Sequence, residues 1–117
     1  MHPESGAVFE AYRTAMRAGL AALEDRISEA TRGYLEATSE LRRVGLLWEL
    51  ARTQLDFVIA VGPGVREARD AAEEARATFE RLGARPYLER LEAALGPGDS
   101  ERRPAASPSG RSDPVTA

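Results

Sequence analysis

Few residues of this chain have the types and spacing that enzymatic chemistry requires. The only histidine is His2, close to the amino terminus, and the chain contains neither cysteine nor lysine. Without a second histidine or a thiolate, a nitrogen- or sulfur-ligated metal site is not expected. The serines and threonines have no partner base that could activate them as nucleophiles. We therefore predict no catalytic residue, no metal ligand and no cofactor, and expect that the protein is not an enzyme.

Carboxylates are the one abundant group that could carry acid–base chemistry. Glu73 and Glu74 are adjacent, and Glu36 and Glu40 are one helical turn apart. In helices these residues fall on the polar side, near arginines that can pair with them, which is typical of a solvated helix face. The segment Gly62-Pro63-Gly64 lacks the spacing and the lysine of a phosphate-binding loop, and predicts a turn between helices.

Composition limits the class of protein. With 117 residues, 43% hydrophobic and 30% charged, the chain has the size of one small domain. Its net charge of −3 comes from interspersed acidic and basic residues, which argues against nucleic-acid binding. The longest apolar stretch, about 57–61, is far shorter than a membrane span, and residues 1–6 lack the features of a secretory signal. We expect a cytoplasmic protein with no nucleic-acid or membrane partner.

The apolar spacing predicts an all-α chain with one helical domain over residues 7–96, preceded by a disordered lead over 1–6. The segment 97–117, rich in proline, serine and glycine, predicts a disordered tail. The stretch 55–61 has strand-like composition, so a strand there is the alternative to a helix. The predicted helices cover about 7–24, 25–44, 46–61, 65–82 and 86–95.

An apolar seam of six residues occurs twice, 38 residues apart, and each copy is followed by a glycine, Gly45 or Gly83. Steps of three and four residues place each seam on one side of a helix, and a repeat of this length indicates a helical array. Gly33 corresponds to Ala71 in this register, so a small residue in both copies predicts close helix packing. The first copy is Ile27, Ala30, Tyr34, Ala37, Leu41 and Val44; the second is Val65, Ala68, Ala72, Ala75, Phe79 and Leu82.

The seam resembles the tetratricopeptide repeat (TPR), whose second helix carries a small residue, an aromatic residue four positions on, and a small residue three further. Ala30, Tyr34 and Ala37 match this pattern, and the residues Ala68, Ala72 and Ala75 match it with alanine in place of the aromatic. The 38-residue unit is longer than the usual ~34. The resemblance implies antiparallel helix hairpins in a right-handed solenoid fragment of about two and a half repeats, ending in a short capping helix. It also implies a non-catalytic protein–protein interaction or scaffolding module in which these six residues pack between helices.

The segment 75–90 is similar to the carboxy-terminal repeats of large bacterial signalling proteins, such as ATPase-linked adenylate/guanylate cyclases and MalT- or LuxR-type regulators. In those proteins the repeats sense or scaffold, while separate domains carry the activity. The alternative function is therefore a carboxy-terminal regulatory fragment of a larger signalling ATPase, nucleotide cyclase or transcriptional regulator. A small helical-bundle enzyme or ligand binder is a third hypothesis.

Two apolar features could contact a partner. The first predicted helix shows no polar outer cap, which predicts self-association or docking onto another protein or further repeats. Its apolar residues are Val8, Phe9, Tyr12, Met16 and Leu20. Trp48 begins the third predicted helix. Packing between repeats is one interpretation of Trp48, and an exposed anchor in a partner's groove is the other.

Overall fold

The computed structural model describes residues 3–96, and within them all regular secondary structure is α-helical. Residues 55–61 lie within a helix, which excludes the strand alternative. None of the described helices is both long and apolar enough to cross a membrane. The predicted tail at 97–117 lies outside the described residues. The five helices are α1 (Pro3–Leu23), α2 (Ile27–Arg43), α3 (Leu47–Val61), α4 (Arg66–Leu82) and α5 (Arg85–Leu95).

Helix α1 begins at Pro3, inside the segment 1–6 that the sequence analysis assigns to a disordered lead. Proline fits the first turn of a helix, because the N–H that it lacks would have no intrahelical acceptor there. The other four helices begin and end within about two residues of the predicted bounds.

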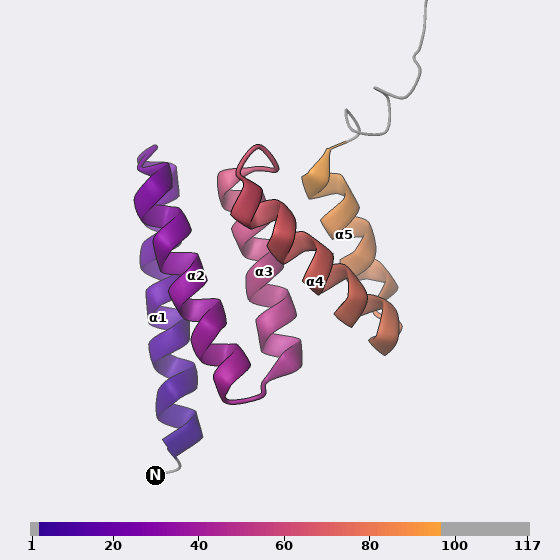
Figure 1. The fold of residues 1–117 in the computed structure, drawn as a ribbon, viewed down its shortest axis with the longest axis horizontal. Helices are drawn as coiled ribbons and strands as arrows, with labels where there is room; N and C mark the ends of the chain where they lie inside the picture. Colours follow the sequence, from indigo (N-terminus) through magenta and orange to yellow (C-terminus); the bar gives the residue numbers. More distant parts are fainter. Residues whose placement is uncertain (1–2, 97–117) are drawn as a thin grey trace, which may run out of the picture.

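The helices form two consecutive hairpins and a final single helix (Figure 1). Helix α1 pairs with α2 and α3 pairs with α4, while α5 packs against both α3 and α4. Contacts of α3 with α1 and α5 place these three helices in one layer, and α2 and α4 lie in front of them in the view of Figure 1.

The glycine that follows each repeated seam is in the left-handed conformation. Gly45 has φ +77° and Gly83 has φ +68°. A Cβ atom built at either position would meet no atom within 4 Å. Left-handed geometry at the end of a helix favours glycine because other residues are strained there. The turn between α1 and α2 uses Asp25 instead, with φ +65°.

The core combines small seam residues with larger buried side chains, among them Phe57, Phe79, Leu41, Leu50 and Leu55. The seam residues Ala30, Tyr34, Ala37, Ala68, Ala72 and Ala75 are all buried. The Tyr34 ring stacks on the Phe57 ring of α3, with 5.1 Å between the centroids. This stack joins the first hairpin to the second, because Tyr34 belongs to α2 and Phe57 to α3.

Candidate protein-interaction surface

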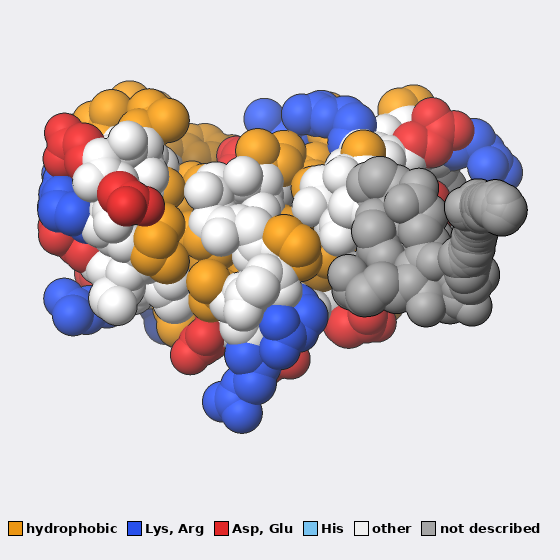
Figure 2. All heavy atoms as spheres, turned by 90° about the horizontal axis from the view of Figure 1, so that it is seen from above, with side chains coloured by type: hydrophobic (Ala, Val, Ile, Leu, Met, Phe, Trp, Pro, Cys, Tyr) orange, Lys and Arg blue, Asp and Glu red, His pale blue; other side chains and the backbone are white. Residues whose placement is uncertain are grey.

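Large apolar side chains of α1 face away from α2. The buried side of α1 consists of alanines, Ala11, Ala18 and Ala21. Since successive helical residues are turned by about 100°, Met16 lies roughly 160° around the helix from Ala18. We define the α1 stripe as Phe9, Tyr12, Met16, Leu20 and Leu23, whose exposed fractions are 64, 37, 68, 57 and 84%. Figure 2 shows hydrophobic side chains gathered over this edge of the molecule, at its upper left.

A groove between α1 and α3 continues the α1 stripe toward the second hairpin. Tyr12 and Met16 line its α1 side, while Arg52 and Asp56 line its α3 side and Tyr34 borders it from α2. Its volume is about 450 Å³. Tyr12 and Met16 therefore belong both to the α1 stripe and to this groove, which makes the two one continuous surface.

Two titratable groups that line the groove, Tyr34 and Asp56, have raised pKa values. Burial raises the pKa of the Tyr34 hydroxyl, and the negative charge of Asp56 adds to the effect. Burial also raises the pKa of Asp56, although the positive charges of Arg52 and Arg90 oppose this. Desolvation is the main cause of both shifts, but Arg52 and Asp56 are exposed, so the groove presents charged groups as well as apolar ones.

The two remaining residues of the predicted binding set lie elsewhere. Val8 is half-buried on α1 and does not belong to the exposed stripe. Trp48 lies in an aromatic cluster, where its ring meets the Phe79 ring edge-on at 5.8 Å and the Tyr87 ring edge-on at 4.9 Å. Trp48 therefore packs between α3, α4 and α5, which is the first of its two interpretations.

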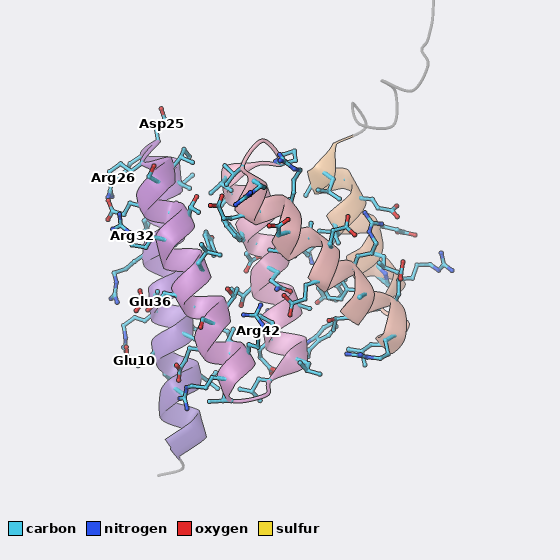
Figure 3. The ribbon with its side chains drawn as sticks, viewed as in Figure 1. Glu10, Asp25, Arg26, Arg32, Glu36 and Arg42 are labelled. Atoms are coloured by element: carbon cyan, nitrogen blue, oxygen red, sulfur yellow. The ribbon has the colours of Figure 1, made fainter. Side chains whose placement is uncertain are left out.

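The outer side of the first hairpin, away from α3, is polar. The hollow between α1 and α2 on this side is lined by Arg17, Arg32 and Glu36, and Figure 3 shows Arg32 and Glu36 there, with Glu10 and Arg26 along the same edge. The expectation that the first helix has no polar outer cap is therefore wrong. The large apolar residues of α1 lie on a different side of this helix, not on the outer side of the first hairpin.

Two of the four carboxylates considered for acid–base chemistry, Glu74 and Glu40, have structural partners. Glu74 on α4 accepts hydrogen bonds from Arg42 Nη2 at 2.7 Å and from Gln54 Nε2 at 2.9 Å. These bonds join α2, α3 and α4, and they lower the pKa of Glu74, with Arg42 as the larger cause. Glu40 pairs with Arg43 on the same helix. Residues 3–96 contain no group of three or more histidines, cysteines or acidic residues arranged to hold a metal ion.

The α3 side of the groove was not predicted from the sequence. Arg52 and Asp56 are one helical turn apart, and Asp56 interrupts the most apolar run of the chain, which was a usable signal. Leu23 was also absent from the predicted set, although it continues the helical spacing of Met16 and Leu20.

No protein-family model, no curated protein and no solved structure matches this chain.

Proposed function

We propose that this chain is a non-catalytic protein–protein interaction module of the TPR-like kind, working in the cytoplasm. In this proposal α1–α2 and α3–α4 are two repeats of a right-handed helical array and α5 is its short cap. The repeated seam supports it, because corresponding small residues, Ala30 and Ala68, are both fully buried at helix contacts. Contacts between α2 and α3 and between α1 and α3 agree with stacking of one hairpin on the next.

The α1 stripe is the observation that carries the binding function. Single exposed apolar residues are ordinary on protein surfaces, but a contiguous row of five large ones is typical of a surface that binds another protein. The groove beside it extends the apolar area and adds polar groups at Arg52 and Asp56 that could orient a bound segment.

The resemblance of residues 75–90 to repeats of bacterial signalling proteins adds a second setting for the same surface. If the array is the carboxy-terminal part of a signalling ATPase, cyclase or transcriptional regulator, the protein held by the α1 stripe is a domain of that longer chain. The binding chemistry is the same in both settings, because the stripe and the groove provide it.

A matched pair of leucine substitutions tests the proposal. Leu20→Glu places a carboxylate in the α1 stripe, whereas Leu35→Glu makes the same change on α2, at a residue that is 41% exposed and outside the stripe. Both variants and the unchanged chain are immobilised after circular dichroism has shown equal helicity. Proteins retained from a lysate of the source cells are then compared.

The proposal predicts that the unchanged chain and Leu35→Glu retain the same proteins and that Leu20→Glu loses them. Retention of the same proteins by all three chains would show that the α1 stripe is not the binding surface. Loss with both variants would point to a surface that includes α2, and would equally contradict the proposal.

A further inference from the structure

The residues of the α1 stripe are spaced symmetrically about Met16. Tyr12 and Leu20 lie four residues before and after Met16, and Phe9 and Leu23 lie seven residues before and after it. All five residues are exposed along the same side of one helix. Reversing the direction of α1 about Met16 therefore gives the same pattern of apolar positions.

A surface with this symmetry matches a second copy of itself. In a two-fold symmetric dimer each patch must be complementary to its own copy, with residue i against residue j and residue j against residue i. When two α1 helices are antiparallel and centred on Met16, Phe9 of each copy lies opposite Leu23 of the other, and Tyr12 lies opposite Leu20. The two Met16 side chains meet at the axis.

We propose that two copies of this chain associate through antiparallel pairing of their α1 helices, about a two-fold axis at Met16. The inference rests on the proposed function, in which the α1 stripe binds protein, and it names a second copy as the protein bound. Helices packed in this way lie 8–10 Å apart, and large side chains opposite one another fill that space. Methionine, which is flexible and polarizable, suits the central position because it must pack against itself.

The area available fits a dimer that forms reversibly. From their exposed fractions, the five side chains offer on the order of 500 Å² of apolar surface per copy. If pairing covered all of this surface, two copies would bury at most about 1,000 Å², the lower limit for a specific interface. The basic residues Arg13 and Arg17 flank one side of the stripe. In the antiparallel pair they lie near Arg13 and Arg17 of the other copy, and repulsion between these positive charges weakens the pairing. The Glu10–Arg13 ion pair at 3.2 Å partly offsets this repulsion within each copy.

Other occupants fit the α1 stripe less well. A further repeat would stack on the outer side of the first hairpin, and that side is polar at Arg17, Arg32 and Glu36. The 97–117 segment of the same chain contains only one large aliphatic residue, Val115, and no aromatic residue. One valine cannot cover five large apolar side chains, so this segment does not match the stripe.

Single cysteines test the register directly, because the chain contains no cysteine of its own. A disulfide requires Cα atoms within about 7 Å of each other. In the antiparallel pair the two copies of residue 16 meet at the axis, whereas the two copies of residue 9 are about 21 Å apart along the helices. The full chain is prepared as Met16→Cys, Phe9→Cys and Leu23→Cys, with Leu35→Cys as the control for random collisions. Circular dichroism first verifies that each variant is folded.

Under mild oxidation we expect Met16→Cys alone to form a covalent dimer in high yield. Phe9→Cys and Leu23→Cys should each remain at the background set by Leu35→Cys, whereas an equal mixture of the two should form the mixed dimer. If all three single variants cross-link to themselves and the mixture forms no additional product, the helices are parallel and the proposal is overturned. If none exceeds the Leu35→Cys background, α1 does not pair with a second copy, which also overturns it.

The proposed function can fail or survive independently of this result. If no cysteine variant cross-links but Leu20→Glu still loses proteins that Leu35→Glu retains, the α1 stripe binds a different protein. In that case the antiparallel dimer is rejected and the interaction module stands. If the stripe variants change neither readout, both proposals are rejected.

Discussion

Gly33 on α2 lies so close to Ala18 on α1 that a Cβ atom built on Gly33 would stand 2.8 Å from the Ala18 Cβ. Side-chain carbons do not approach one another this closely, so the first hairpin has no room for even a methyl group at this position. The closeness explains why a glycine, unfavourable inside a helix, occurs in the middle of α2. It also fixes which side of α1 is buried, since only a side made of alanines can approach α2 so closely.

We predict that Gly33→Ala destabilises the fold, although alanine is the better helix former. The gain in helix propensity is about 1 kcal/mol, and forcing a methyl group into a tight contact costs about 1–3 kcal/mol. The free energy of unfolding should therefore fall by on the order of 1 kcal/mol, measured by urea denaturation. Gly6→Ala on α1, where a Cβ would meet nothing within 4 Å, is the control and should not lose stability.

A reciprocal substitution separates this contact from other effects. Ala18→Gly combined with Gly33→Ala moves the methyl group from α1 to α2 and restores the original clearance. We expect the double variant to lose less free energy of unfolding than the two single variants lose together. The difference should be at least about 0.5 kcal/mol, as is typical of residues in contact. Strict additivity would show that the two residues do not limit how closely the helices approach.

Our second prediction concerns the seam of the second hairpin. Ala68 is fully buried on α4, so Ala68→Arg would force a long charged side chain into a helix contact. We expect a loss of several kcal/mol, or no folded protein, because both overpacking and burial of a charge are costly. Glu73→Arg introduces the same residue on the exposed side of the same helix and should change stability by less than about 0.5 kcal/mol. Thermal melting of the two variants makes the comparison, and equal melting temperatures would mean that the seam is misplaced.

Acid should weaken the contact between the two hairpins through Glu74. Hydrogen bonds from Arg42 and Gln54 hold the pKa of Glu74 below its ordinary value of 4.5. A carboxylate with a lowered pKa in the folded state stabilises the fold above the unfolded-state pKa, and this contribution is lost as the pH falls through the folded-state pKa. Since the Glu74 side chain is 43% exposed, the effect should be no more than about 1 kcal/mol.

Glu74→Gln isolates this contribution. The variant should be less stable than the unchanged chain at pH 7, and the difference should shrink as the pH is lowered below 4.5. Urea denaturation at a series of pH values gives both curves. A stability difference that stays constant down to pH 2.5 would show that ionisation of Glu74 does not contribute.

The sequence was a good guide to the helices because local signals mark their ends and sides. Gly45 and Gly83 follow the carboxy-terminal ends of α2 and α4, as predicted. The small and aromatic residues of both seams are buried. The spacing of apolar residues at intervals of three and four is a property of a single helix. It can therefore be found without knowing which helices pack against that helix.

The side on which α1 packs could not be found in the same way. Helix α1 has two apolar sides, one of alanines and one of large residues, and hydrophobicity alone favours burial of the larger side chains. The close contact between Gly33 and Ala18 instead selects the small side, which leaves Met16 and its neighbours exposed. The groove depends on Asp56 and Tyr34 from different helices, and only the packed arrangement brings these residues together.

In the proposed dimer, the α1 stripe of each chain is covered by that of a second copy. Sedimentation equilibrium of the full chain over a range of concentrations measures this association, with Met16→Glu and Leu35→Glu measured beside it. We expect the mass of the unchanged chain and of Leu35→Glu to rise from 12.7 kDa toward twice that value with concentration. Met16→Glu should stay at 12.7 kDa, because it would bring two carboxylates together at the two-fold axis. A constant mass of 12.7 kDa for the unchanged chain at every concentration would show that α1 does not bind a second copy.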